Sequence, residues 1–362
     1  MNTDKRFWLG LVLFFVFIVF VCFLPYLFTN YSWFDLDFSD SGEVGDTIGG
    51  IMGPFIAIAA SVLTFLAFWV QYQANLEQKR QFNEALEKQQ TENKQRDKTW
   101  KIERFEGRFY ELLKLHKANI NEINIGDRVK GRKSFVPMFS ELRLCYNTVI
   151  DMMKAASQAE REEHQYNNIN PLSLAYTVFF FGIGVQSEKQ YVPDFSTGER
   201  HLFKDVKERL EGIQKSVEST FENEPSKRFY VHDLPTNRIY DDRTVEIYYY
   251  PFDGHMNVLG HYFRHIFQTV NYVLSQDFLD DDEKYRYLKT FRAQISNFEQ
   301  LMLYYNSMAW FQKEWHKIFT DYRFIKNLPL NLADFSVLPE AHFAEDIIRL
   351  RKLGKEMFEK YE

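Results

Sequence analysis

Two uncharged apolar runs constrain this chain more than any other feature of its sequence. They cover residues 7–28 and 47–73 and contain no Asp, Glu, Lys or Arg. A helix needs about 20 apolar residues to cross a ~30 Å hydrocarbon core, so both runs are long enough. A cleavable signal peptide would have an apolar region of about 7 to 15 residues that ends in small residues, whereas Leu24, Pro25 and Tyr26 stand near the end of the first run. We predict a two-helix transmembrane hairpin over residues 1–73.

The charged residues beside the two runs predict the orientation of the hairpin. Lys5 and Arg6 precede the first run, and Lys79 and Arg80 follow the second. The segment between the runs has no Lys or Arg, and its acidic residues are Asp35, Asp37, Asp40, Glu43 and Asp46. Cytoplasmic flanks carry an excess of Lys and Arg. We therefore expect a two-span protein of the bacterial inner membrane, with both termini in the cytoplasm and the acidic loop outside.

Small residues recur at every fourth position around the second run. They are Gly45, Gly49, Gly53, Ala57 and Ser61. Such a stripe lets the backbone of another helix approach closely. Two partners fit it: the first span of the same chain, or the same span of another copy, which would make the protein a homo-oligomer.

Beyond the hairpin the sequence predicts a polar stalk. Residues 74–99 are rich in Gln, Glu and Lys and contain no Gly or Pro. This composition indicates a solvated helix that continues the second span. Its heptad positions are too polar for more than a weakly self-associating coiled coil.

Residues 100–362 form the predicted cytoplasmic domain, and their periodicity is helical. Apolar residues recur at spacings of three and four over 203–221 and again over 288–309. The segment 283–328 contains no Gly or Pro, so we predict one long helix or two abutting helices there. Residues 243–252 are β-branched and aromatic and indicate one short strand. The predicted fold class is mainly α.

The remaining composition excludes several classes of protein. The chain has 2 Cys, too few for a disulfide framework or a cysteine zinc site. Beyond residue 72, acidic and basic side chains nearly balance, so a nucleic-acid partner is not expected. The sequence contains no GxxxxGK[ST] loop, no GxSxG elbow and no paired CxxC motif. It therefore assigns no enzymatic activity, and we predict no cofactor.

Four stretches of the predicted cytoplasmic domain, hereafter the body, carry a further pattern. They begin at Phe105 (FEGRFYELLKLHKANINEI), Lys130 (KGRKSFVPMFSEL), Leu174 (LAYTVFFFGIG) and Leu259 (LGHYFRHIFQTVNYV), the last paired with FRAQISNFEQLMLYYNSM from Phe291. Together they resemble the putative phage abortive infection family, the AbiC-like proteins of bacterial anti-phage defence. The resemblance spans residues 105–328. It implies a role in defence, often with two amino-terminal spans, and supplies no catalytic residue.

Polar residues of the last pair of stretches form the candidate site. They are His261, Arg264, His265, Arg292, Gln294, Ser296, Asn297, Glu299 and Asn306. His261 and His265 have the i, i+4 spacing that can place two imidazoles on one metal. Upstream, Asp253 and His255 are the nearest further ligand types. We predict no metal site from this pattern.

Two interpretations of the cluster stay open. In one, the polar row from Arg292 to Asn306 is a buried network that joins its helix to Arg264 and His265, since buried polar groups must be paired. In the other, the cluster lines a pocket for a nucleotide, a phosphate or an RNA phosphodiester, with Arg264 and Arg292 as the anion-binding forks.

Taken together, these features predict a membrane-anchored anti-phage defence protein. Its body would sense infection and its hairpin would act at or through the inner membrane. The expected partners are the membrane, further copies of the chain, and a phage-derived protein or a partner defence protein. The alternative is a membrane-tethered nuclease or nucleotide-binding effector. Helical defence ribonucleases place an Arg a few residues before a His, whereas Arg264 directly precedes His265.

Overall fold

The computed structural model describes residues 2–30, 41–125, 129–223, 229–232, 244–247 and 249–359. Its α-helices are α1 (Asn2–Asn30), α2 (Ser41–Glu122), α3 (Phe135–Ala155), α4 (Gln158–Glu163), α5 (Pro171–Phe181), α6 (Val185–Tyr191), α7 (Thr197–Asn223), α8 (Met256–Leu274), α9 (Asp281–Arg292), α10 (Asn297–Trp310), α11 (Gln312–Thr320), α12 (Pro339–His342) and α13 (Ala344–Lys352). Short 3-10 helices are η2 (Gly131–Ser134), η3 (Tyr166–Asn168) and η4 (Val192–Asp194). The predicted mainly α fold class is confirmed.

Four short strands form two antiparallel pairs. β1 (Asn124–Ile125) pairs with β2 (Val129–Lys130), and β3 (Phe229–His232) pairs with β4 (Thr244–Ile247). β4 is the short strand predicted within residues 243–252.

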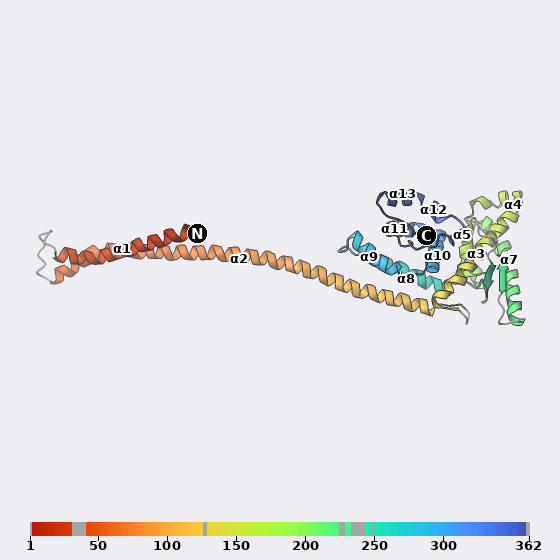
Figure 1. The fold of residues 1–362 in the computed structure, drawn as a ribbon, viewed down its shortest axis with the longest axis horizontal. Helices are drawn as coiled ribbons and strands as arrows, with labels where there is room; N and C mark the ends of the chain where they lie inside the picture. Colours follow the sequence, from red (N-terminus) through yellow and green to blue (C-terminus); the bar gives the residue numbers. More distant parts are fainter. Residues whose placement is uncertain are drawn as a thin grey trace. The chain divides into compact units, whose positions relative to one another are not determined.

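The chain separates into two compact units, Met1–Asp97 and Lys98–Glu362. The first contains α1 and the beginning of α2, two helices long and apolar enough to cross a membrane (Figure 1). The two helices lie alongside each other, and the rings of Phe17 and Phe55 are 6.3 Å apart. Most of their large apolar side chains are exposed, for example Phe15 at 66% and Phe65 at 64%. Residues 31–40, with most of the predicted acidic loop, lie outside the described residues.

The predicted stripe of small residues lies on α2. A Cβ built at Gly45, Gly49 or Gly53 meets no atom within 4 Å. Ala57 and Ser61 are exposed, and the Ser61 hydroxyl donates to the Ala57 carbonyl at 2.9 Å. Within the described part of the chain, α1 therefore leaves this stripe uncovered.

In the second unit, α3 packs against α5, α7 and α10. Within the stripe predicted at 203–221, the buried residues of α7 are Phe203, Val206, Leu210 and Val217. α10 is buried on every side, since Leu301 to Tyr305 are all inaccessible to solvent. A helix that is apolar and buried all round is a core helix. The other helices of this unit are arranged around α3 and α10.

Two glycines bring the end of α5 against the start of α8. Gly182 and Gly254 have φ of +83° and +88°, which favours glycine. A Cβ at Gly182 would lie 2.6 Å from the Asp253 backbone, and one at Gly254 would lie 2.5 Å from the Phe181 backbone. The His255 amide next to this crossing donates to a carbonyl at the end of α5 at 2.8 Å. α8 therefore begins at a fixed point against α5.

The segment 283–328 differs from its prediction. It contains the greater part of α9, then α10 and α11, so the expectation of one or two helices was wrong. The chain turns at residues 293–296, where Ser296 caps α10: its hydroxyl accepts from the Glu299 amide at 3.4 Å, and the Glu299 carboxylate accepts from the Ser296 amide at 2.7 Å. Apolar spacing continues through the turn at Ile295 and Phe298, which conceals the break.

Candidate functional site

α8 has one apolar and one polar face. Its buried residues include Leu259, Phe263, Ile266, Val270 and Val273. Along the other side, exposed polar residues follow one another at spacings of three and four: Asn257, His261, Arg264 and Gln268. This periodicity aligns four polar side chains on one side of a rigid element.

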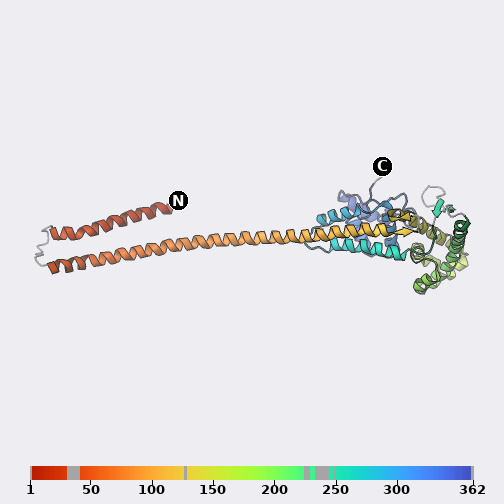
Figure 2. The same ribbon diagram turned by 90° about the horizontal axis from the view of Figure 1, so that it is seen from below.

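The polar face of α8 and the end of α2 enclose a groove of about 480 Å³, hereafter the α2–α8 groove. Figure 2 shows α8 running alongside the last turns of α2. The lining residues are Asn119, Glu122, Ile123, Asn257, Val258, His261, Tyr262, Arg264, His265 and Gln268. Three members of the predicted cluster, His261, Arg264 and His265, come together here.

The exposed polar groups of the groove are not bonded to one another. In the part of the chain that the structure describes, Arg264 and His261 have no hydrogen-bond or ion-pair partner for their side chains. The same holds, among those residues, for the side chains of Asn119, Glu122, Asn257 and Gln268. These donors and acceptors are therefore available to a bound molecule.

Two histidine rings stack behind the groove. His265 Nε2 donates to the Leu112 carbonyl at 3.0 Å, which leaves Nδ1 of the neutral ring as an acceptor. The ring of His116 lies 5.9 Å away and nearly parallel. Burial, with smaller contributions from His265 and Arg132, lowers the pKa of His116 to about 3, and burial also lowers the pKa of His265. Both rings are neutral at pH 7.

His116 is an unusual buried residue. It is 1% exposed, and neither ring nitrogen has a hydrogen-bond partner among the described residues. Its neighbours are the rings of Tyr262, His265 and Phe291. Most buried polar groups in proteins have a hydrogen-bond partner, so the unpaired imidazole of His116 is an exception to this rule.

Glu299 of α10 connects Tyr262 in the groove wall to Arg132 of η2. This buried carboxylate accepts from the Tyr262 hydroxyl at 2.8 Å, and Arg132 Nε lies 3.1 Å from it. Arg132 also donates to the Gln294 carbonyl at 2.5 Å. Burial and the Glu299 carboxylate raise the pKa of Tyr262 well above its ordinary value, so the phenol stays a donor. Sequence reasoning did not pair Arg132 with Glu299, because 167 positions separate them in the chain.

Other predicted residues do not line this groove. Arg292 is 6% exposed and donates to the Arg323 carbonyl at 2.6 Å, and burial lowers its pKa. The Asn306 amide donates to the Tyr176 hydroxyl at 3.0 Å inside the core. The structure does not bring Arg264 and Arg292 together as one anion-binding pair.

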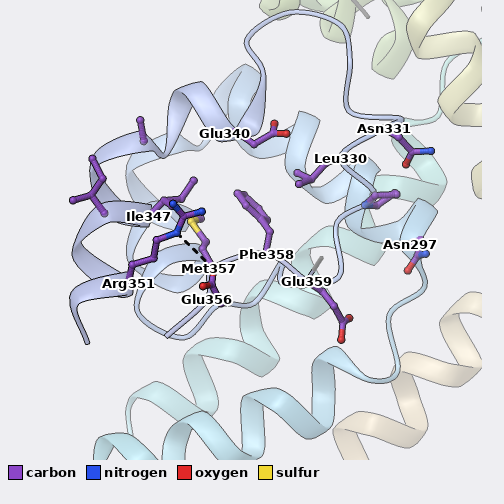
Figure 3. A pocket seen from close by; sticks show the side chains of 13 residues that line it. Asn297, Leu330, Asn331, Glu340, Ile347, Arg351, Glu356, Met357, Phe358 and Glu359 are labelled. Carbon is purple, nitrogen blue, oxygen red and sulfur yellow. Dashed lines mark ion pairs between the residues drawn. The ribbon is translucent and has the colours of Figure 1, made fainter. Parts of the chain in front are cut away.

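A larger hollow of about 1060 Å³ lies among the C-terminal elements (Figure 3). Apolar side chains of Leu330, Ile347, Met357 and Phe358 line it. At its edge Arg351 lies 3.8 Å from Glu356. The predicted residue Asn297 lines this hollow and not the α2–α8 groove.

Two buried charged residues of α3 were not predicted from the sequence. Arg143 forms an ion pair with Asp334, and both are buried. Glu141 accepts from the Tyr249 hydroxyl and lies 3.2 Å from His255 Nε2. These pairs join segments more than 100 positions apart, so no local pattern marks them. They hold the core around α3 and stand apart from the groove residues.

The groove offers binding groups: a guanidinium, a carboxylate, an exposed imidazole and several amides. Across the described residues, no group of three or more His, Cys, Asp and Glu side chains could hold a metal ion. His261 and His265 share a helix face, but His265 Nε2 is committed to Leu112.

Comparison with known families identifies the segment that contains α8. Residues 254–332 match the family model of the putative phage abortive infection proteins. The match begins at Gly254 and contains α8 to α11, and therefore the α8 wall of the groove and Glu299. The resemblance inferred from the sequence is confirmed over this segment. The stretches from Phe105, Lys130 and Leu174 lie outside the matched residues and stay predictions. No curated protein and no solved structure matches the chain.

Proposed function

We propose that this protein is a membrane-anchored anti-phage defence protein, which senses infection through its cytoplasmic helical body and acts at or through the inner membrane. The observation that carries the proposal is the match of residues 254–332 to the abortive infection family. The same segment supplies most of the unpaired polar groups of the α2–α8 groove. The family resemblance and the available binding groups therefore coincide on α8.

The exposed apolar helices support membrane anchoring. The most apolar window of α1 is 6% buried and that of α2 is 0% buried. A large apolar side chain left in water forgoes about 1.5–3 kcal/mol of burial energy, so a hydrocarbon environment accounts for this surface. The flanking charges favour cytoplasmic termini. A reporter fused after Lys98 should report the cytoplasm and one inserted at residues 32–41 the periplasm; the reverse pair of results would overturn this orientation.

The continuity of α2 supports a link between sensing and the membrane. This helix carries an apolar segment from Ile48 onward and ends at Glu122, in the lining of the groove. A molecule that contacts Asn119 or Glu122 therefore acts on the same helix that would cross the bilayer.

The uncovered stripe of small residues supports self-association. No described atom of the chain fills the space beside Gly49 and Gly53. Close backbone contact at small residues is a main source of helix association in lipid. In this proposal, rearrangement of a homo-oligomer transmits the signal, and the trigger is a phage-derived protein, a partner defence protein or a small molecule made during infection.

The test expresses the full-length chain in a phage-sensitive bacterium and combines membrane fractionation with plaque counts for a panel of phages. We expect the protein in the inner-membrane fraction and at least a tenfold loss of plaques for some phages. Protection by protein found in the soluble fraction would contradict the membrane role. Inner-membrane protein that protects against no phage of the panel would contradict the defence role.

A further inference from the structure

We propose that the α2–α8 groove binds a nucleoside monophosphate. Arg264 holds the phosphate, and the amide side chains on both helices contact the base and the sugar. This inference rests on the proposed sensing role, for which it names the ligand class. It goes beyond the family match, which assigns no ligand.

The anion-binding group is Arg264. Its guanidinium is exposed, lines the groove and has no partner among the described residues. A guanidinium presents a planar fork of N–H donors that matches the oxygens of a phosphate. His261 lies one helical turn earlier on the same face and supplies a second donor at short reach. The two side chains together form a site for one phosphate group.

The base-binding groups are the amides. Asn257 and Gln268 stand on α8 on either side of Arg264, and Asn119 faces the groove from α2. An amide offers a donor and an acceptor side by side and can pair with the edge of a nucleobase. The half-buried ring of His265 belongs to the same lining, whereas the Tyr262 ring is only 1% exposed. An imidazole ring is also a surface on which an unpaired base can stack.

Size and charge favour a mononucleotide over a polyanion. The groove encloses about 480 Å³, within the range of about 300–1,000 Å³ typical of small-molecule sites. Its lining contains one arginine and one glutamate, Arg264 and Glu122, so its formal charge is balanced. Binding of an RNA backbone depends on neutralising several phosphates at once. Glu122 would repel further phosphates and can accept from sugar hydroxyls.

His116 is a second observation that points to this place. It is buried directly behind the lining residues Tyr262 and His265, with both ring nitrogens unpaired within the described structure. A buried polar group without a hydrogen-bond partner destabilises the fold. Proteins concentrate such exceptions to good packing at functional sites. The unpaired imidazole therefore marks the wall of the groove as a place where packing is not optimised for stability.

The experiment is isothermal titration calorimetry on the purified full-length protein in detergent. The probes are AMP, GMP, CMP and UMP, each compared with its nucleoside and with inorganic phosphate. We expect at least one monophosphate to bind at least tenfold more tightly than either comparison ligand. Arg264→Ala should weaken that binding tenfold or more, whereas Arg286→Ala, which removes an exposed arginine of α9 outside the groove, should leave it unchanged. Melting temperatures of both variants establish that they are folded.

Several outcomes would overturn the inference. One is that no monophosphate binds more tightly than inorganic phosphate; another is that Arg264→Ala binds as the wild-type protein does. Preference for a short single-stranded RNA over all four probes would also overturn it. Gln268→Leu should change the ranking of the four bases, and an unchanged ranking would contradict the assignment of the amides. Because the assay contains no phage, binding without protection contradicts the defence role alone, and protection without binding contradicts this inference alone.

Discussion

Replacing His116 by leucine should stabilise the protein. The imidazole lies among the rings of Tyr262, His265 and Phe291, and neither nitrogen finds a partner in the described structure. Leucine has a similar volume, carries no polar atom and has a higher helix propensity. Removing the unpaired nitrogens should raise the free energy of unfolding by about 1–3 kcal/mol at pH 7.5. For a large domain each kcal/mol corresponds to roughly 2–4 °C in Tm.

The gain should grow as the pH falls. The pKa of His116 is about 3 in the folded protein and 6.5 ordinarily. Above pH 6.5 neither state binds the proton, so the stability is fully present. Between pH 6.5 and pH 3 the unfolded chain binds a proton that the folded protein does not, which favours unfolding. At pH 5 this linkage costs the wild-type protein about 2 kcal/mol, at 1.36 kcal/mol for each pKa unit, and the leucine variant is spared that cost.

The assay is thermal unfolding of the full-length protein in detergent at pH 7.5 and pH 5. His261→Leu serves as the control, because His261 is exposed and has no partner among the described residues. That control should shift neither the melting temperature nor its pH dependence appreciably. A lower melting temperature for His116→Leu at pH 7.5, or the same difference from wild type at both pH values, would refute the reasoning.

Substitutions elsewhere in the chain test its packing. Gly254→Ala should lower the free energy of unfolding by roughly 3 kcal/mol in urea titrations, because it combines a positive φ with backbone contact at 2.5 Å. Gly260 lies within α8, and a methyl group added there meets the Phe180 ring of α5 at an ordinary contact distance of 3.7 Å. Gly260→Ala should therefore raise the free energy of unfolding by about 0.5–1 kcal/mol. Arg292→Ala should lower it by about 1–3 kcal/mol, since the Arg323 carbonyl loses its donor, and unchanged stability would contradict the buried role. Gly49→Leu should reduce the oligomer size seen by cross-linking in membranes while Gly50→Leu, on a neighbouring face, should not; equal behaviour of the two variants would mean that the stripe faces lipid.

The sequence predicted the helices well because their periodicity is local. Apolar residues of α7 and α8 repeat at spacings of three and four, and those at Val206, Leu210 and Val217 in α7 and at Leu259, Ile266 and Val270 in α8 are fully buried. The break between α9 and α10 was missed, although the sequence carries a signal for it. Ser296 and Glu299 form the S-x-x-E pattern of a capping box, and the same pattern begins α4 at Ser157. Because the apolar spacing continues across the break, it predicted a continuous helix despite this capping pattern.

The candidate site was predictable in part. His261, Arg264 and His265 come together because they share one helix face, and helical spacing alone determines that. The ion pair of Glu299 with Arg132 and the partners of Glu141 were not predictable, because these partners arrive from segments more than 100 positions away. The end of α2 forms the other wall of the groove. Nothing in the sequence indicates that this segment lies beside α8.

The central claim is that the α2–α8 groove is required for protection against phage. The most direct measurement is the efficiency of plating on cells that carry wild-type protein, Arg264→Ala or Arg286→Ala at equal levels in the membrane fraction. We predict that Arg264→Ala restores plaque formation at least tenfold, whereas Arg286→Ala protects as well as the wild-type protein. Equal protection by all three proteins would contradict the account.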